Sequence, residues 1–215
     1  MDGLIDIDSA RALVSDAALW PRVRDFLWNF SSQIHPSWLE NHPTIKLSNY
    51  PTALGSPRVS RWILRELEVK PCFHPFPADD GSRLLLLPAQ TYLNIGLWLA
   101  ALARANELRN VISGARVREL KAALPGVYPD VLKVAPYFHK WQLPAADGDD
   151  FAVNGLRYLA TALKDLPVEL LGRQRLRFPV EREGGFDPLD GEVPFAEINR
   201  LMQIQFPKEY ALCCS

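Results

Sequence analysis

The chain has 215 residues, of which 48% are hydrophobic and 23% charged, and its formal net charge at pH 7 is -1. This composition is typical of an ordinary globular protein and excludes a disordered chain. A nearly neutral charge argues against a dedicated nucleic-acid binder, in which a strongly basic domain is expected.

The first predicted helix runs from Asp16 to Ile34. Apolar residues recur in this segment at three- and four-residue spacing, which indicates one buried stripe. Asp16 is placed to cap its start, and Pro21 falls near the first turn, where a helix tolerates proline. A second helix is predicted to begin at Ser56 and Pro57, as an N-cap followed by a proline at the first helical position.

The segment 88–104 is almost wholly apolar, as expected for the buried central helix of an all-α domain. The overlapping segment 84–103 is also about as long as a membrane span. However, Gln90, Thr91 and Asn94 would each need a hydrogen-bond partner in hydrocarbon. We therefore favour a buried helix over a transmembrane one.

Two further apolar sets follow this helix and are expected to be buried. The first set is Leu108, Val111 and Ile112, and the second, on a new amphipathic helix, is Val117, Leu120 and Leu124. Farther on, Arg173 to Phe178 is the one stretch that alternates like a strand. Residues 180–194 are rich in glycine and proline and have little to bury, which predicts a linker.

A last amphipathic helix follows that linker. Its apolar face consists of Phe195, Ile198, Leu201 and Met202. Eighteen prolines, mostly placed at helix ends, favour many short helices over a long regular bundle. The predicted fold is all-α, a compact bundle of short, irregularly packed helices around a buried central helix. Residues 1–215 are expected to form a single helical domain, with a flexible linker near 180–194 before the C-terminal helix.

Candidate catalytic and metal-binding residues are few. Cys72 and His74 lie in a proline-rich loop, and their closeness in sequence does not establish the geometry that a cysteine nucleophile needs. The spacing of the four histidines matches no common zinc motif; they are His35, His42, His74 and His139. The acidic run of Asp147, Asp149 and Asp150 lacks the features of a calcium loop. We expect no catalytic residue, no metal site and no cofactor.

Basic residues are more informative because they cluster on a few predicted elements. The candidate partner-binding residues are Arg104, Arg109, Arg116, Arg118, Lys121, Arg173 and Arg175, and Arg177 continues the last alternation. Arginine is enriched at protein interfaces and binds carboxylates through paired hydrogen bonds, so one interpretation is docking onto an acidic partner. The alternative is a solvated helix face with local ion pairs to Glu107 and Glu119.

Three blocks resemble a known family. They are LLLLPAQ with LWLAALA and LRNVISGARVRELKAAL in the segment 84–124, IHPSWL at 34–39, and the segment that begins a short helix at Gly155 and Leu156 and ends in RLRFP at 175–179. Together they are similar to the type III secretion accessory proteins of the YscK/SctK/HrpD type, which belong to the sorting platform beneath the bacterial injectisome.

This resemblance implies a non-catalytic adaptor. The family's expected partners are the cytoplasmic, forkhead-associated-like domain of the inner-membrane ring protein and the pod protein, through which the ATPase complex is reached. No nucleic acid and no cofactor are implied. An alternative of another class is an uncharacterised α-helical hydrolase or transferase that uses Cys72 and His74.

The expected location is the bacterial cytoplasm, at the cytoplasmic face of the inner membrane when assembled. The first ten residues carry acidic side chains where a signal peptide has basic ones, and they lack a continuous apolar core. The three cysteines are Cys72, Cys213 and Cys214, and an odd number with two adjacent does not form a disulfide framework. A reducing compartment is the simpler interpretation.

Overall fold

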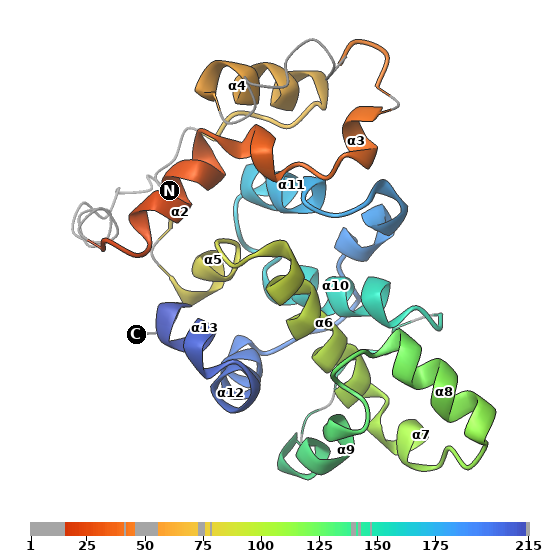
Figure 1. Cartoon of the computed structure of the whole chain (residues 1–215). Helices are drawn as coiled ribbons and strands as arrows, with labels where there is room; N and C mark the ends of the chain where they lie inside the picture. Colours follow the sequence, from red (N-terminus) through yellow and green to blue (C-terminus); the bar gives the residue numbers. More distant parts are fainter. Residues whose placement is uncertain are drawn as a thin grey trace. The chain divides into compact units, whose positions relative to one another are not determined.

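The structure is a computed structural model that describes residues 16–40, 42–45, 56–72, 76–77, 79–138, 141, 143–146 and 148–213. Every regular element among these residues is a helix, which confirms the predicted all-α fold (Figure 1). The α-helices are α2 (Trp20–Leu27), α3 (Ser37–Glu40), α4 (Pro57–Glu66), α5 (Asp80–Leu84), α6 (Ala89–Ala103), α7 (Ala105–Arg109), α8 (Gly114–Ala123), α9 (Asp130–Val134), α10 (Phe151–Ala162), α11 (Val168–Leu176), α12 (Phe195–Gln205) and α13 (Pro207–Cys213). The short 3-10 helices are η1 (Phe30–Gln33), η3 (Ala135–Phe138) and η4 (Val180–Phe186).

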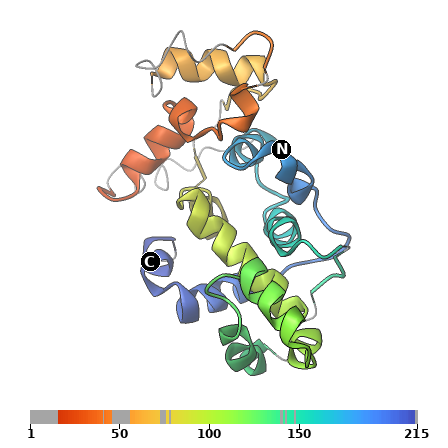
Figure 2. The ribbon, with the colours of Figure 1, turned by 45° about the vertical axis from the view of Figure 1, so that its right-hand side comes forward.

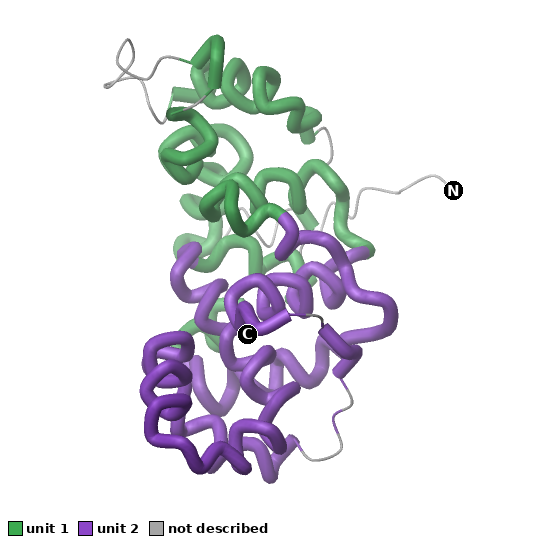
Figure 3. The backbone as a smooth tube through the Cα atoms, turned by 90° about the vertical axis from the view of Figure 1, so that its right-hand side faces the viewer, with its two compact units in different colours: residues 1–87, 165–183, 208–215 green, residues 88–164, 184–207 purple. Residues whose placement is uncertain are grey.

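The chain divides into two compact units, and neither is one continuous stretch. Unit 1 comprises residues 1–87, 165–183 and 208–215, and unit 2 comprises residues 88–164 and 184–207 (Figure 3). Residues 180–194, the predicted linker, begin in unit 1 and continue in unit 2. The single helical domain expected from the sequence stays a prediction.

Unit 2 is built on the pairing of α6 with α10, which lie side by side (Figure 2). Every residue of α6 from Tyr92 to Leu102 except Asn94 is buried. The long apolar helix expected at 88–104 is therefore confirmed as a buried one. Each fully buried leucine contributes about 1.5–3 kcal/mol through removal of its apolar surface from water.

Two glycines set the distance between α6 and α10. A Cβ atom added to Gly96 would lie 2.9 Å from the carbonyl carbon of Gly155, and one added to Gly155 would collide with the carbonyl group of Gly96. The two backbones are thus in direct contact, without side chains between them. Gly155 lies inside α10 rather than at its start, because Asp150 caps the helix by accepting hydrogen bonds from the Ala152 and Val153 amides at 2.8 and 3.1 Å.

The segment from Gly185 to Val193, which includes the end of η4, packs against α10, so the expectation that residues 180–194 have little to bury is wrong. Gly185, Leu189 and Val193 are buried. The Leu189 amide donates to the Thr161 hydroxyl at 2.8 Å, and a Cβ on Gly185 would lie 2.9 Å from the Leu156 Cβ. Gly185 allows this close contact with α10, and the flexible linker near 180–194 stays a prediction.

Unit 1 begins with the predicted cap. The Asp16 carboxylate accepts hydrogen bonds from the amides of Ala18 and Leu19 at 2.8 and 3.0 Å. The single helix expected from Asp16 to Ile34 is interrupted after Leu27, and the chain continues in η1. The apolar periodicity survives this break, because Val23, Phe26 and Phe30 are all buried.

Helix α4 packs against η1 through a small polar contact. The hydroxyls of Ser31 and Ser60, both buried, lie 2.9 Å apart, and the Ser60 hydroxyl also accepts from the Ser31 amide at 3.0 Å. Ile63 and Leu64 complete the buried side of α4. Since Ser60 fixes which side faces inward, the residues on the other side of α4 are left exposed.

The end of α4 adopts an unfavourable backbone conformation. The Val69 amide donates to the Leu64 carbonyl at 2.8 Å and the Glu68 amide to the Arg65 carbonyl at 3.1 Å, the two hydrogen bonds of a Schellman motif. Glu68 occupies the position that glycine normally fills, with φ of 57°. A side chain there costs energy because its Cβ approaches the following carbonyl.

Arg177 joins the end of α11 to the segment after α5. Its guanidinium donates to the carbonyls of Leu85 and Leu87 at 2.8 and 2.7 Å, and to the Gln174 side-chain oxygen at 2.8 Å. Arg177 is only 9% exposed. The Arg177 guanidinium therefore provides hydrogen bonds in the interior of unit 1 to the carbonyls of Leu85 and Leu87, which follow the end of the short helix α5.

We predict that Gly155→Ala destabilises unit 2 by about 1–3 kcal/mol, because the added methyl forces α6 and α10 apart. The measurement is urea unfolding followed by circular dichroism. Gly172→Ala in α11 is the matched control, since a Cβ there lies at an ordinary 3.5 Å from Val69. The control is expected to be neutral or stabilising by up to about 1 kcal/mol. Equal effects of the two changes would contradict the proposed contact.

Replacing Glu68 by glycine is expected to stabilise the protein by about 0.5–1 kcal/mol, since glycine adopts the left-handed conformation without strain. Glu119→Gly, within α8, provides the comparison and should cost about 1 kcal/mol. Thermal melts of both variants test this difference. Destabilisation by Glu68→Gly would show that the side chain has a favourable role that outweighs the strain.

Candidate docking surface

Helices α7 and α8 in unit 2 carry most of the predicted basic residues. Only Ala105 and Leu108 of α7, and only Leu120 of α8, are buried. Of the predicted apolar stripe on α8, Leu120 and Leu124 are buried and Val117 is half-buried. A ten-residue helix that is anchored by so few side chains exposes most of its surface to solvent.

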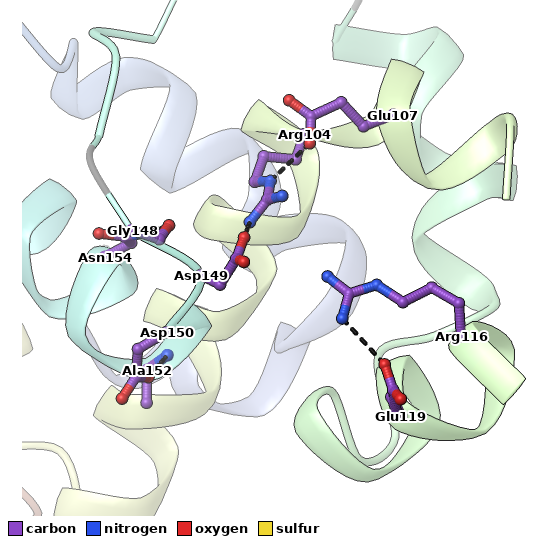
Figure 4. A network of polar contacts seen from close by, with 9 residues as sticks. All are labelled: Arg104, Glu107, Arg116, Glu119, Gly148, Asp149, Asp150, Ala152 and Asn154. Atoms are coloured by element: carbon purple, nitrogen blue, oxygen red, sulfur yellow. Dashed lines mark hydrogen bonds and ion pairs between the residues drawn. The ribbon is translucent and has the colours of Figure 1, made fainter.

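Arg104 is committed to contacts inside unit 2. Its guanidinium pairs with the carboxylates of Glu107 at 2.8 Å and Asp149 at 3.1 Å, and lies 5.0 Å from the centre of the Phe151 ring (Figure 4). Partial burial opposes the charge, but the two carboxylates outweigh it and raise the pKa of the Arg104 guanidinium. Arg104 therefore joins the end of α6 to the start of α10 and is not free for a partner.

Arg116 also has a local partner, because its guanidinium pairs with Glu119 at 2.9 Å (Figure 4). Both side chains are largely exposed. The sequence also allowed the alternative that basic residues form local ion pairs with Glu107 and Glu119. This alternative holds for Arg104 and Arg116. Three of the predicted cations remain on this surface.

Arg109, Arg118 and Lys121 are exposed and have no ion pair with a carboxylate of the described residues. Arg118 and Lys121 lie three residues apart and so share one side of α8. We call Arg109, Ile112, Arg118 and Lys121 the basic face. Its members combine uncompensated positive charge with an exposed apolar side chain.

Ile112 is 96% exposed, so the prediction that it continues the buried face is wrong. The residue lies between α7 and α8, where the backbone is not helical, and helical spacing no longer decides which way a side chain points. Leu108, inside α7, is buried as predicted.

The segment from Arg173 to Phe178 is not a strand; α11 extends through Leu176. Arg173 is 4% exposed, and its guanidinium donates to the carbonyls of Phe26 and Leu27, at the end of α2, at 3.0 and 2.6 Å. Arg175 is half-buried; it pairs with Glu183 at 2.9 Å and lies 5.5 Å from the centre of the Trp38 ring. The alternation misled because it treated the arginines as outward-facing, whereas Arg173 is an interior residue of unit 1.

The other candidate residues form no site among the described residues. Cys72 is half-buried, and His74 lies outside the described residues, as do His139, Asp147 and Cys214. Within the part of the chain that the structure describes, no group of three His, Cys, Asp or Glu residues can hold a metal ion.

The remaining acidic and cysteine residues have local contacts. Asp149 pairs with Arg104, and Asp150 caps α10. Cys213 is buried, with its sulfur 3.6 Å from the Arg83 carbonyl oxygen. Among the described residues, no helix is long and apolar enough to cross a membrane.

Sequence reasoning missed a second cationic surface, on α4 in unit 1. Arg58, Arg61 and Arg65 recur at three- and four-residue spacing, which places them along one side of the helix. That spacing was available in the sequence. The buried side of α4 is formed by Ser60, Ile63 and Leu64, which leaves the three arginines exposed.

An all-α fold with an exposed cationic helix face defines, as a class, a helical protein suited to binding an acidic partner. Residues 24–206 match the family described as YOP proteins translocation protein K (YscK), and the chain belongs to this family. It is therefore a type III secretion system protein, as the sequence resemblance predicted. Members of this family are components of the secretion system, and the family is not a known enzyme family. No curated protein and no solved structure matches the chain.

Replacing Arg173 by glutamine is expected to destabilise the protein by about 2–4 kcal/mol, because two carbonyls at the end of α2 lose a charged donor in the interior. Arg118→Gln, which removes an exposed arginine of the basic face, should change stability by less than about 0.5 kcal/mol. Urea unfolding of the two variants separates an interior role from a surface one. A neutral effect of Arg173→Gln would contradict the interior assignment.

Proposed function

We propose that this protein is a non-catalytic adaptor of the type III secretion sorting platform. In this proposal it links the cytoplasmic, forkhead-associated-like domain of the inner-membrane ring protein to the pod protein, and through it to the ATPase complex. It acts in the bacterial cytoplasm, at the cytoplasmic face of the inner membrane when assembled. Membership of the YscK family supports a role within this machinery.

The observation that carries the adaptor role is the basic face. Arg118 and Lys121 are exposed without a described carboxylate to neutralise them, and Ile112 places an almost fully exposed apolar side chain near the start of the same helix. An adaptor contact of ordinary size combines a few apolar anchors with charge complementarity. An acidic surface on a partner would supply the missing counter-charge.

Arg104, Arg116 and Arg175 contribute less to such docking, because each already has a carboxylate partner within the protein. Arg173 is excluded from the proposed surface by its burial. Arg109 remains a candidate at its edge. Of the basic residues predicted from the sequence to bind a partner, Arg109, Arg118 and Lys121 are left for this docking surface.

The test is a pull-down of the tagged protein from the native bacterium in mild detergent, with the recovered proteins identified by mass spectrometry. The ring protein and the pod protein are expected with the unaltered chain. Arg118→Glu combined with Lys121→Glu should lower recovery of one of the two by about tenfold or more, because attraction becomes repulsion.

Lys164→Glu combined with Lys208→Glu is the matched control. It makes the same change in net charge at two exposed lysines that lie outside α8. This control should leave recovery of both partners unchanged. Neither double variant is expected to change the stability of the protein. Absence of both partners with the unaltered chain would overturn the adaptor proposal, and equal losses for the two double variants would overturn the assignment to the basic face.

A further inference from the structure

Unit 1 contains a groove beside α4 whose walls are apolar. Its volume is about 610 Å³, within the range of about 300–1,000 Å³ usual for binding pockets. Trp62, Leu64, Val69 and Pro71 line it. Leu64 and Val69 are buried beneath it, and the Schellman turn at the end of α4 shapes one side by directing the chain back along the helix.

Cationic side chains surround these apolar walls. Four cations line the groove and are all exposed: Arg58, Arg61, Arg65 and Lys70. Among the described residues of the lining, Glu68 is the one carboxylate. Only Arg65 has an ion pair with a described residue, at 3.6 Å from the adjacent Glu66. The groove therefore carries a net positive charge at its rim.

Arg173 adds a buried positive charge to the lining of the groove. Its guanidinium is held by the carbonyls of Phe26 and Leu27, and it has no ion pair with a carboxylate of the described residues. Its Nε atom is buried and has no hydrogen-bond partner among the residues that the structure describes. Burial lowers the pKa of the Arg173 guanidinium, and the Cys72 thiol acts on it in the opposite direction without outweighing the burial.

These observations specify the chemistry of an occupant. An apolar side chain would displace water from Trp62 and Val69, while carboxylates on either side of it would pair with Arg58 and Arg61 and bring negative charge near Arg173. Guanidinium groups bind carboxylates through paired hydrogen bonds, and a partly desolvated cation gains most from such a pair. A nucleic acid would satisfy the charge, but its sugar-phosphate backbone would leave the apolar walls unfilled.

We propose that the α4 groove binds an acidic protein segment that inserts a bulky apolar side chain against Trp62 and places its carboxylates on Arg58 and Arg61. The inference rests on the proposed function only in taking that segment to belong to another component of the secretion machinery. It gives the adaptor a second contact surface, in unit 1, that is distinct in composition from the basic face of unit 2.

The test uses the purified full chain as bait and a library of random 12-residue peptides displayed on phage as the probe. Selected peptides are expected to contain aspartate and glutamate flanking a leucine, phenylalanine or tryptophan. The best peptide is then synthesised and its dissociation constant measured by fluorescence anisotropy at low and at high salt. Binding should weaken as salt rises, because exposed cations provide part of it.

Arg58→Glu combined with Arg61→Glu should weaken peptide binding at least tenfold. Both side chains are exposed, so the variant is expected to fold, and a thermal melt checks this. The matched control is Lys164→Glu combined with Lys208→Glu, which makes the same change in net charge at two exposed lysines outside α4 and α8 and should leave peptide binding unchanged. Trp62→Ala should weaken binding as well, through loss of the apolar contact.

Selection of peptides without acidic residues, or binding that is unaffected by the Arg58 and Arg61 changes, would overturn the inference. So would tighter, Arg58- and Arg61-dependent binding of a single-stranded oligonucleotide than of any selected peptide, since it would assign the groove to nucleic acid. The proposed function fails separately: a chain that binds acidic peptides in this groove, yet recovers no secretion component from cells, keeps this inference and loses the adaptor role.

Discussion

The backbone contact between Gly96 and Gly155 is the constraint on which unit 2 depends. A helix as apolar as α6 requires cover on most of its circumference, and α10 can supply it only if the two axes come close enough for their backbones to touch. That approach leaves a second side of α10 for the end of η4, where Gly185 comes equally close to Leu156. Small residues at three points thus allow these segments of chain to approach one another closely.

Arginines have three different environments in this protein. Arg173 and Arg177 are interior donors to backbone carbonyls, which short helices leave in excess at their ends. Arg104 and Arg175 combine a carboxylate with an aromatic ring and hold neighbouring segments together. A third group is exposed and has no carboxylate partner among the described residues, as Arg58, Arg61, Arg109 and Arg118 show. Total charge therefore says little about binding here.

Much of the fold is predictable from the sequence, because helical periodicity and proline positions are local properties. The buried helix at 88–104 was predicted in this way and is confirmed, and Asp16 accepts hydrogen bonds in the turn that precedes α2. The family was predicted from three sequence blocks and is confirmed as well. The failures at Ile112 and at Arg173 have one cause. In both, tertiary structure decides the environment of the side chain. The non-helical backbone between α7 and α8 turns Ile112 outward, and the end of α2 places carbonyls beside Arg173. Similarly, the groove on α4 depends on the course of the chain after Glu68, which no periodicity encodes.

The order of the two units along the chain has a consequence for how the protein is made. Unit 1 takes segments from both sides of unit 2, and unit 2 in turn resumes after residue 183. A ribosome releases the N-terminal part first, yet the segment that carries Arg173 and Arg177 emerges only after most of unit 2 has been synthesised. During that interval the carbonyls of Phe26, Leu85 and Leu87 lack their guanidinium donors. The N-terminal part of unit 1 can therefore complete its interior hydrogen bonds only late in translation.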